Sequence, residues 1–263
     1  MQLTGHICPI SEISQRDRNA MFALMQRYYE NIDRDTFDQD LDKKDVAIVA
    51  RDRDDGSVGG FSTQVIYHQR IGNTIVHVLF SGDTIVDRRY WGDNPLAQIW
   101  GRLALSLIDQ FPHDQLYWFL ISKGYKTYRF LPVFFREFYP RYDRPTPPWA
   151  HTLISEIASA RFGQQFCAST GILQATVQSC RLRRTVAELT SHRLKNPHLA
   201  YFNRVNPGHI NGDELCCIAP LSRENFRRSA FQVIGQLTSA EQSPIHAPCV
   251  STAASRERES GTQ

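Results

Sequence analysis

The sequence predicts a mixed α/β protein of the α+β kind, in which a mostly antiparallel sheet is flanked by helices. Three observations lead to this prediction: helical spacing of apolar residues near the N-terminus, three consecutive β-branched stretches separated by turn signals, and a strand-helix-strand unit after them. A helical insertion and an extra C-terminal helix are expected in the second half. With 263 residues, of which 41% are hydrophobic, the chain can bury a sizeable core.

The first two elements are predicted to be helices. Met21, Leu24, Met25 and Tyr28 recur at helical spacing within residues 14–32, and Ser14 is available as the N-cap. The acidic stretch DRDTFDQDLDKKD that follows suits a short exposed helix.

Three strands are predicted next, at 46–52, 58–69 and 74–87. Each stretch is rich in β-branched residues, an Asp-Gly turn signal separates the first two, and IGN separates the second pair. Because the connections are this short, the three strands should pair antiparallel in sequence order.

A strand-to-helix turn lies in TIVDRRYWGDNPLAQIW, residues 84–100. Pro95 fits the first turn of a helix, and apolar residues from Leu96 to Ile108 mark one face of that helix up to about residue 110. LYWFLIS, residues 116–122, is then a buried strand. A crossover of this length predicts that it runs parallel to the strand before the helix.

The most aromatic part of the chain is YKTYRFLPVFFREFYPRYD, residues 125–143. One interpretation is a helix that packs on the sheet. The other is a tunnel for an apolar group, lined by Phe130, Phe134, Phe135 and Phe138.

The later elements have weaker signals. Two helices are predicted within residues 150–195, with the three arginines of CRLRRTVAEL on a helix face that is either solvated or a docking surface for an acidic carrier protein. LAYFNRV and ELCCIAPL are predicted to form a last hairpin, and a helix should run from about 223 to 237. His209, Asp213 and Glu214, between and beside those strands, suit an acid/base or metal cluster, although Gly, Asn and Asp are also what a turn requires.

We expect residues 1–143 to form the donor-binding core. Residues 144–238 are expected to complete the fold or form a second lobe, and 239–263 to be a disordered tail, because that segment is polar and unpatterned.

Charge and cysteine content exclude several classes of protein. The formal net charge of +3 is spread along the chain without a basic block, so no nucleic-acid partner is expected. No run of about 18 apolar residues and no signal-peptide core occur, so we expect a cytoplasmic protein without stable membrane insertion. The six cysteines form no CxxC pair, and adjacent Cys216 and Cys217 suit buried thiols, so no metal is expected.

The order of these elements resembles that of the GNAT superfamily, the acyl-CoA-dependent N-acyltransferases. The resemblance covers residues 14–143, with 199–220 as the candidate for the last two strands. VAIVARDRDDGSVGGFS resembles the superfamily's strand, Asp-Gly turn and strand, and IVDRRYWGDNPL resembles the strand-to-helix motif that holds the cofactor pyrophosphate. The resemblance implies acyl-CoA as the acyl donor.

The pyrophosphate turn departs from the family pattern. That pattern commonly reads Tyr-Arg-Gly-Lys-Gly-Ile-Gly, and of the matching positions only Tyr90 and Gly92 agree. Pro95 removes one N–H donor and Asp93 places negative charge near the expected phosphates, whereas Arg88 and Arg89 could supply the charge of the missing motif arginine. The turn is therefore either a phosphate site, diverged enough to allow another donor such as an acyl-carrier protein, or only a capped corner. The cofactor-binding residues that the resemblance implies are Val86, Arg88, Arg89, Trp91, Gly92, Asp93 and Asn94.

Amine acylation needs a base for the amine and an acid for the departing thiolate. HVLFSGDT places His77 and Asp83 on one face of a regular strand, which makes them candidate bases, although polar strand residues are often structural. The superfamily frequently uses a Tyr in the helix after the fifth strand as the acid. The matching position here is Phe135, so Tyr128 or Tyr139 is the candidate substitute.

The resemblance therefore implies an N-acyltransferase that acts on a primary amine. The aromatic density of 125–143 favours a medium or long fatty acyl group, and the chain also resembles the GNAT-like maturases of ribosomally made lipopeptides, which acylate Lys or ornithine side chains of a precursor peptide. The alternatives are a short-chain N-acetyltransferase of a small amine and a catalytically inactive scaffold that binds a peptide or a carrier protein. The sequence does not indicate the oligomeric state.

Overall fold

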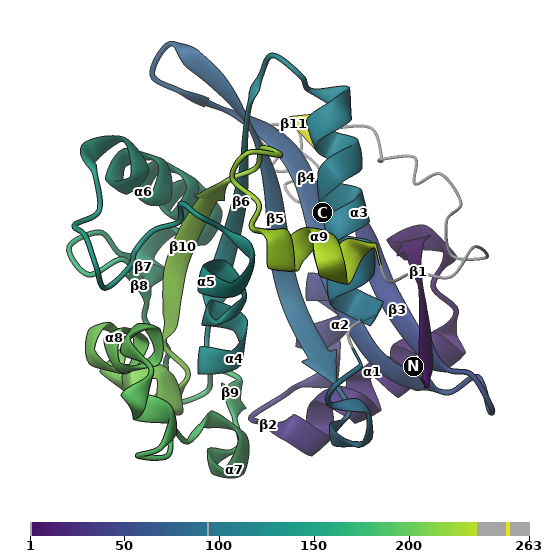
Figure 1. The fold of residues 1–263 in the computed structure, drawn as a ribbon. Coiled ribbons are helices and arrows are strands. Elements are labelled where there is room, and N and C mark those ends of the chain that lie inside the picture. Colours follow the sequence, from purple (N-terminus) through teal and green to yellow (C-terminus); the bar gives the residue numbers. More distant parts are fainter. Residues whose placement is uncertain (1, 94, 236–250, 253–263) are drawn as a thin grey trace, which may run out of the picture.

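One mixed sheet organises the fold. The computed structural model describes residues 2–93, 95–235 and 251–252. The strands lie in the order β1 (Leu3–Pro9), β3 (Val46–Asp52), β4 (Val58–Ile71), β5 (Thr74–Val86), β6 (Gln115–Ser122), β10 (Glu214–Pro220), β8 (Ile172–Leu173) and β7 (Phe166–Cys167) (Figure 1). Along this path β5 and β6 are parallel and the other pairs antiparallel, so the predicted fold class is confirmed. β11 (Ser251–Thr252) pairs with β4.

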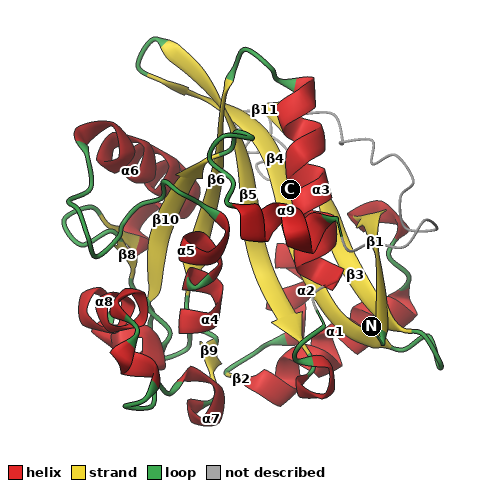
Figure 2. Ribbon diagram, viewed as in Figure 1, coloured by secondary structure: helices red, strands yellow, loops and turns green. Residues whose placement is uncertain are grey.

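Helices cover both faces of the sheet (Figure 2). The helices α3 (Pro95–Gln110), α4 (Tyr125–Tyr128), α5 (Phe130–Phe134), α8 (Pro197–Val205) and α9 (Arg228–Ile234) share one apolar cluster with the sheet. On the opposite face, α1 (Gln15–Tyr28) and α2 (Arg34–Asp42) cover β3, β4 and β5, and α6 (Pro148–Phe162) covers β4, β5 and β10. Among the described residues, no helix is long and apolar enough to cross a membrane.

The predicted helix and turn signals act locally as expected. The Ser14 side chain accepts a hydrogen bond from the Asp17 backbone N–H and caps α1, and Asp33 caps α2 in the same way through Thr36. Gly56 has a φ of 71° in the turn between β3 and β4, a conformation that favours glycine.

The central parallel strands separate before they end. β5 pairs with β6 from Val76 to Ser81 and then continues through Gly82–Val86 without a β6 partner. The β4–β5 register also shifts between Ser62 and Gln64. The backbone edge of β5 beyond Ser81 therefore faces open space instead of another described strand.

A small second sheet joins the two halves of the chain. β2 (Tyr29–Glu30) follows α1 directly and pairs antiparallel with β9 (Arg181–Leu182). The Arg181 guanidinium lies 3.1 Å from the Glu30 carboxylate. The segment around Cys180 is thereby fixed beside the end of α1.

Several sequence predictions were wrong. The edge strand β1 was missed, because its apolar residues are interrupted by Gly5 and His6. Residues 125–143 are not one helix: α5 ends at Phe134, and the backbone then bonds to distant segments, with Tyr139 N–H donating to the Ile218 carbonyl. Such long-range pairing outweighs local helical spacing.

The predicted elements after residue 150 also differ. α6 ends at Gly163, and β7, β8, β9 and the single turn α7 (Arg184–Ala187) replace the second predicted helix, so the arginines of CRLRRTVAEL do not share a helix face. LAYFNRV lies in the helix α8, whose N-cap is Asn196 with Pro197 in the first turn, so there is no hairpin at 199–220.

The C-terminal predictions are met only in part. α9 begins at Arg228, not 223, because Asn225 bonds through its side chain to the Glu137 and Pro220 carbonyls instead of entering a helix. The predicted disordered tail lies outside the described residues except for 251–252.

Candidate active site

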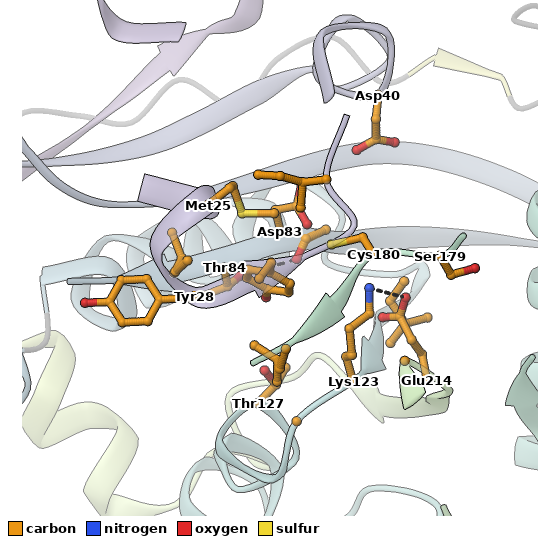
Figure 3. Close-up of a pocket in the computed structure, with 18 of the residues that line it drawn as sticks. Met25, Tyr28, Asp40, Asp83, Thr84, Lys123, Thr127, Ser179, Cys180 and Glu214 are labelled. Atoms are coloured by element: carbon orange, nitrogen blue, oxygen red, sulfur yellow. Dashed lines mark hydrogen bonds and ion pairs between the residues drawn. The ribbon is translucent and has the colours of Figure 1, made fainter. Parts of the chain in front are cut away.

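A cavity of about 1040 Å³ opens where β5 and β6 separate. Its walls include the ends of α1 and α2, the end of β5, the segment after β6, the turn before α3, the segment around β9, the end of α6 and the start of β10. Figure 3 shows several of these side chains around the gap. Side chains from both faces of the sheet line it, including Trp91 and Thr127 on the α3 side and Phe37 and Phe162 on the other. The cavity therefore reaches from one face of the sheet to the other through the gap between the strands.

Two carboxylates and an ammonium group gather in this gap. Asp83 lies at the end of β5, Lys123 directly after β6, and Glu214 at the start of β10. The Lys123 Nζ is 3.3 Å from Glu214 Oε1, and both side chains are about one-fifth exposed (Figure 3). Antiparallel pairing of β10 with β6 brings this pair together, since Leu215 is opposite Ser122.

Burial decides the charge state of Asp83. Burial in the cavity, with the nearby Asp40 carboxylate adding to it, raises the pKa of Asp83 to about 6, although Lys44 and Lys123 oppose this shift. Burial lowers the pKa of Lys123, but Glu214, Cys180 and Asp83 more than offset this, so its pKa is raised and it stays protonated. The site thus holds one carboxyl that titrates near neutrality beside one fixed cation.

Lys44 has a structural partner, and Cys180 stays neutral. Lys44, whose side chain is 3% exposed, pairs with Asp40 at 2.6 Å. Burial raises the pKa of the Cys180 thiol to about 11, so the thiol remains protonated at neutral pH.

The turn before α3 forms part of the wall through Val86, Trp91, Gly92 and Asp93, four of the residues predicted to bind the cofactor. Gly92 has a φ of 118°, and nothing lies within 4 Å of where a Cβ would be. The Asp93 carboxylate accepts hydrogen bonds from the Gln2 and Leu3 backbone N–H groups, so its charge is bound to the start of β1. Asn94 lies outside the described residues.

The predicted arginines lie beside the cavity and are not part of its wall. Arg88 stacks over the Trp91 ring at 5.5 Å, whereas Arg89 lies 3.4 Å from Asp87. On the other side of the turn, the Lys126 Nζ is 3.2 Å from the Trp91 ring centroid. Burial, with the positive charges of Arg193 and Arg88, lowers the pKa of Lys126 to about 8.

A small apolar cavity of about 50 Å³ adjoins the main one. It lies between α3, α5 and the strands β4, β5 and β6, and Phe130 and Thr127 line both cavities. Phe134 lines only the small one. Phe135 lines neither, because it is buried between Trp100, Trp118 and Phe226.

Three predicted catalytic residues lie elsewhere. The His77 ring stacks on Phe111 and lies 3.2 Å from Asp114, outside the cavity wall. The buried Tyr128 hydroxyl donates to the Pro140 carbonyl, and the Tyr139 hydroxyl donates to Glu137.

The loop before β10 supplies one site residue and no metal cluster. Glu214 lines the cavity, whereas the Asp213 carboxylate accepts from the Ala175 backbone N–H and His209 is buried. In the part of the chain that the structure describes, no group of three or more His, Cys, Asp or Glu side chains could hold a metal ion.

Sequence reasoning missed Lys123, Lys126 and Arg193, which all line the cavity. A usable signal existed for the first two: both follow directly after a buried strand predicted to be parallel to its neighbour, and the carboxyl ends of such strands commonly carry ligands. Arg193 comes from a segment with no such pattern.

Comparisons with known proteins give only distant similarities. No family model matches the sequence, and no curated protein matches it. Among solved structures, a GNAT family N-acetyltransferase (YhbS) from Escherichia coli in complex with CoA is 20% identical, with a TM-score of 0.34, over 49% of this chain and 68% of that chain. A "Probable N-Acyltransferase" from Enterococcus faecalis V583 is 11% identical, with a TM-score of 0.39, over 82% and 65%. An acetyltransferase from Trypanosoma brucei is 18% identical, with a TM-score of 0.35, over 55% and 99%. These values assign neither a family nor an activity to the chain.

Proposed function

We propose that this chain is an N-acyltransferase that moves an acyl group from a phosphopantetheine thioester, carried by CoA or by a carrier protein, to a primary amine. The observation that carries the proposal is the cavity between the separating strands β5 and β6, with Asp83 and the Lys123–Glu214 pair in its centre. Such a passage suits a two-substrate reaction, because the two substrates can enter it from opposite faces of the sheet.

The residues present fit the donor. A phosphopantetheine arm is extended and carries amide groups, and the β5 edge from Gly82 to Val86 offers backbone groups without a β6 partner. Phosphate charge would lie near Lys126 and Arg193, at the end of the cavity marked by Trp91 and Gly92. Gly92 leaves open space at this end.

Asp83 is proposed to remove the proton from the amine. An alkylammonium has an ordinary pKa near 10.4 and cannot attack a carbonyl until it loses a proton. A carboxylate with a pKa of about 6 is ionised at neutral pH and is a stronger base than an ordinary aspartate. The amine nitrogen then forms the C–N bond as the C–S bond of the thioester breaks.

Lys123 is proposed to stabilise the negative charge that develops during transfer. Its ammonium group is held by Glu214 in the same gap as Asp83, and a fixed cation in a partly buried site interacts strongly with a developing oxyanion or thiolate. The departing sulfur leaves beside this cation, which stays protonated, and takes up the second proton that the amine nitrogen loses as the amide forms. No tyrosine is needed for this step, in contrast to the family pattern.

The small cavity is proposed to hold the end of the acyl chain. It is lined by Phe130, Phe134, Trp100 and Leu96, so it suits methyl and methylene groups. Its volume is only about 50 Å³. This size favours a medium-chain over a long-chain acyl group.

The acceptor is proposed to be a Lys or ornithine side chain of a precursor peptide. Asp83 lines the cavity, and its carboxylate would attract a cationic amine. A side chain of this length can reach the gap while the peptide backbone stays outside.

The direct test is acyl transfer measured by mass spectrometry. The purified chain is incubated with octanoyl-CoA, octanoyl-carrier protein or acetyl-CoA, and with Lys- and ornithine-containing peptides. Amide formation with octanoyl donors, reduced by Asp83→Asn, supports the proposal. Transfer of acetyl alone would restrict the function to short-chain acetylation, and absence of any transfer with any donor and amine would leave a binding scaffold.

A further inference from the structure

Four cations surround the donor end of the cavity. They are Arg88 in the turn before α3, Lys126 in α4, Arg129 directly after α4, and Arg193 in the 3-10 turn η4 (Arg193–Lys195). We call these four residues the cation rim. Lys126, Arg129 and Arg193 line the cavity, and the three arginines are exposed.

The rim residues lie close together around aromatic rings. Lys126 and Arg88 both contact the Trp91 ring, at 3.2 and 5.5 Å from its centroid, and Arg193 lies 5.2 Å from the Tyr125 ring centroid. Arg193 and Arg88 are near enough to Lys126 to help lower its pKa. The positive charges of Arg129 and Arg193 both oppose the rise that burial causes in the pKa of Tyr125, so Arg129 lies near the same group. The fold therefore holds four positive charges close together.

No acidic side chain compensates these charges. Among residues 2–93, 95–235 and 251–252, no carboxylate lies within 4.0 Å of a rim side chain, whereas Arg18, Arg27, Arg34 and Arg51 all have such partners. Exposed cations that cluster without acidic partners create a local positive potential that attracts anionic ligands. The rim thus has the properties of a recognition surface.

The arrangement suits an anionic surface better than a diphosphate alone. A compact diphosphate is usually bound by backbone N–H groups that converge at a helix N-terminus. Here Pro95 has no N–H to donate, and the Asp93 carboxylate between the turn and β1 places negative charge nearby. Here, instead, the three arginines of the rim are exposed at the mouth of the cavity. The Trp91 ring, which both Arg88 and Lys126 contact, is 46% exposed.

We infer that the cation rim is the docking surface for an acidic carrier protein, which presents the acyl group on its phosphopantetheine arm. The inference rests on the proposed function and specifies its donor. The single phosphate of the arm would lie at Lys126 and Arg193, which line the cavity, and acidic side chains of the carrier would pair with Arg88 and Arg129. The acyl chain on the arm then enters the gap between β5 and β6.

The experiment compares binding of one acyl group on three carriers. Octanoyl-carrier protein of net negative charge, octanoyl-CoA and octanoyl-pantetheine are titrated into the 263-residue chain by calorimetry, at low and at high salt, with a poly-Glu peptide as the control anion. The test variant carries Arg129→Glu and Arg193→Glu. The matched control carries Arg70→Glu and Arg228→Glu, two exposed arginines that are not part of the cavity wall.

The expected result is that the carrier protein binds at least about tenfold more tightly than octanoyl-CoA, with the steeper salt dependence. The test variant should weaken carrier binding by about tenfold or more, leave octanoyl-pantetheine binding unchanged, and bind CoA with a smaller loss. The control variant should bind all three donors like the wild type.

Other results overturn the inference and are distinguishable from one another. Equal losses for the carrier and CoA in the test variant would make the rim a general phosphate site. Equal binding of a poly-Glu peptide and the carrier would mean unspecific attraction of anions. If octanoyl-CoA binds more tightly than the carrier protein, the carrier is not the donor, but the proposed acyl transfer is unaffected. If none of the three thioesters binds, the proposed function is overturned as well.

Discussion

Replacing Asp83 with asparagine should make the protein more stable and less active. The ordinary pKa of an aspartate is 3.8, and burial raises the pKa of Asp83 to about 6. One pKa unit corresponds to ~1.4 kcal/mol, so holding this group ionised at pH 7 costs the folded state up to ~3 kcal/mol. Asparagine has nearly the same shape and no charge, so Asp83→Asn should recover much of that free energy. For a chain of this size, a gain of ~3 kcal/mol in the free energy of unfolding corresponds to a rise in Tm of about 6 °C or more.

The sign of the pH dependence follows from the same shift. Because the folded carboxyl keeps its proton to a higher pH than the unfolded one, this group lowers the free energy of unfolding as the pH rises from about 4 to about 6. In the variant that decrease should be absent. The wild-type kcat/KM should rise with pH through about 6, because only the ionised carboxylate accepts the proton of the amine.

The assay combines thermal melts with acyl-transfer kinetics between pH 5 and pH 8, where kcat/KM of Asp83→Asn should be lower by ~10²–10⁴-fold and lack the acidic limb. Asp114→Asn, at an exposed carboxylate outside the cavity wall, is the matched control. A variant that keeps full activity refutes the role of Asp83 as base. A variant that loses both stability and activity refutes the reasoning on burial, because it assigns Asp83 a structural role.

Three further outcomes are expected. His77→Ala should leave kcat unchanged within about twofold in the same transfer assay, because the His77 ring packs on Phe111 outside the cavity. A large loss of kcat would restore His77 as a catalytic candidate. Phe134→Trp should shorten the preferred acyl chain in a series of donors, since each buried CH₂ contributes roughly 0.8 kcal/mol and the larger ring would fill the small cavity. An equal loss of rate for short and long donors would mean that Phe134 is only a core residue. Lys123→Met should lower kcat at least about tenfold, with little change in the donor Kd measured by calorimetry. A change in Kd alone would mean that Lys123 binds the donor and does not act in the transfer step.

The sequence predicted the sheet better than the site, for a physical reason. Strands β3, β4, β5 and β6 and the helix α3 have strong local signals: β-branched runs, turn residues and helical spacing. Their order then determines which strands are parallel. Elements stabilised mainly by distant contacts gave no such signal, as with the extended segment after Phe134, which bonds to Arg227 and Ile218.

The site residues divide along the same line. Asp83, Trp91 and Gly92 belong to the strongly predicted β5–α3 unit, and the structure places all three in the cavity wall. His77 was selected by its position on the same strand, but sequence alternation alone does not show where β5 leaves its partner. Only the end of the β5–β6 pairing at Ser81 separates residues that face a gap from residues that face the core.

Parting of the strands also explains why ionisable groups can gather there at all. Where β5 and β6 are paired, the positions are filled by Leu79, Phe80 and Phe119, and a charge would have to be buried among them at high cost. Beyond Ser81 the missing partner strand leaves room for water or substrate, so Lys123 and Glu214 remain partly exposed and keep their ion pair. The same break in the sheet therefore supplies the passage for the substrates and the setting that shifts the pKa of Asp83. A substitution that restored pairing beyond Ser81 would be expected to remove both together.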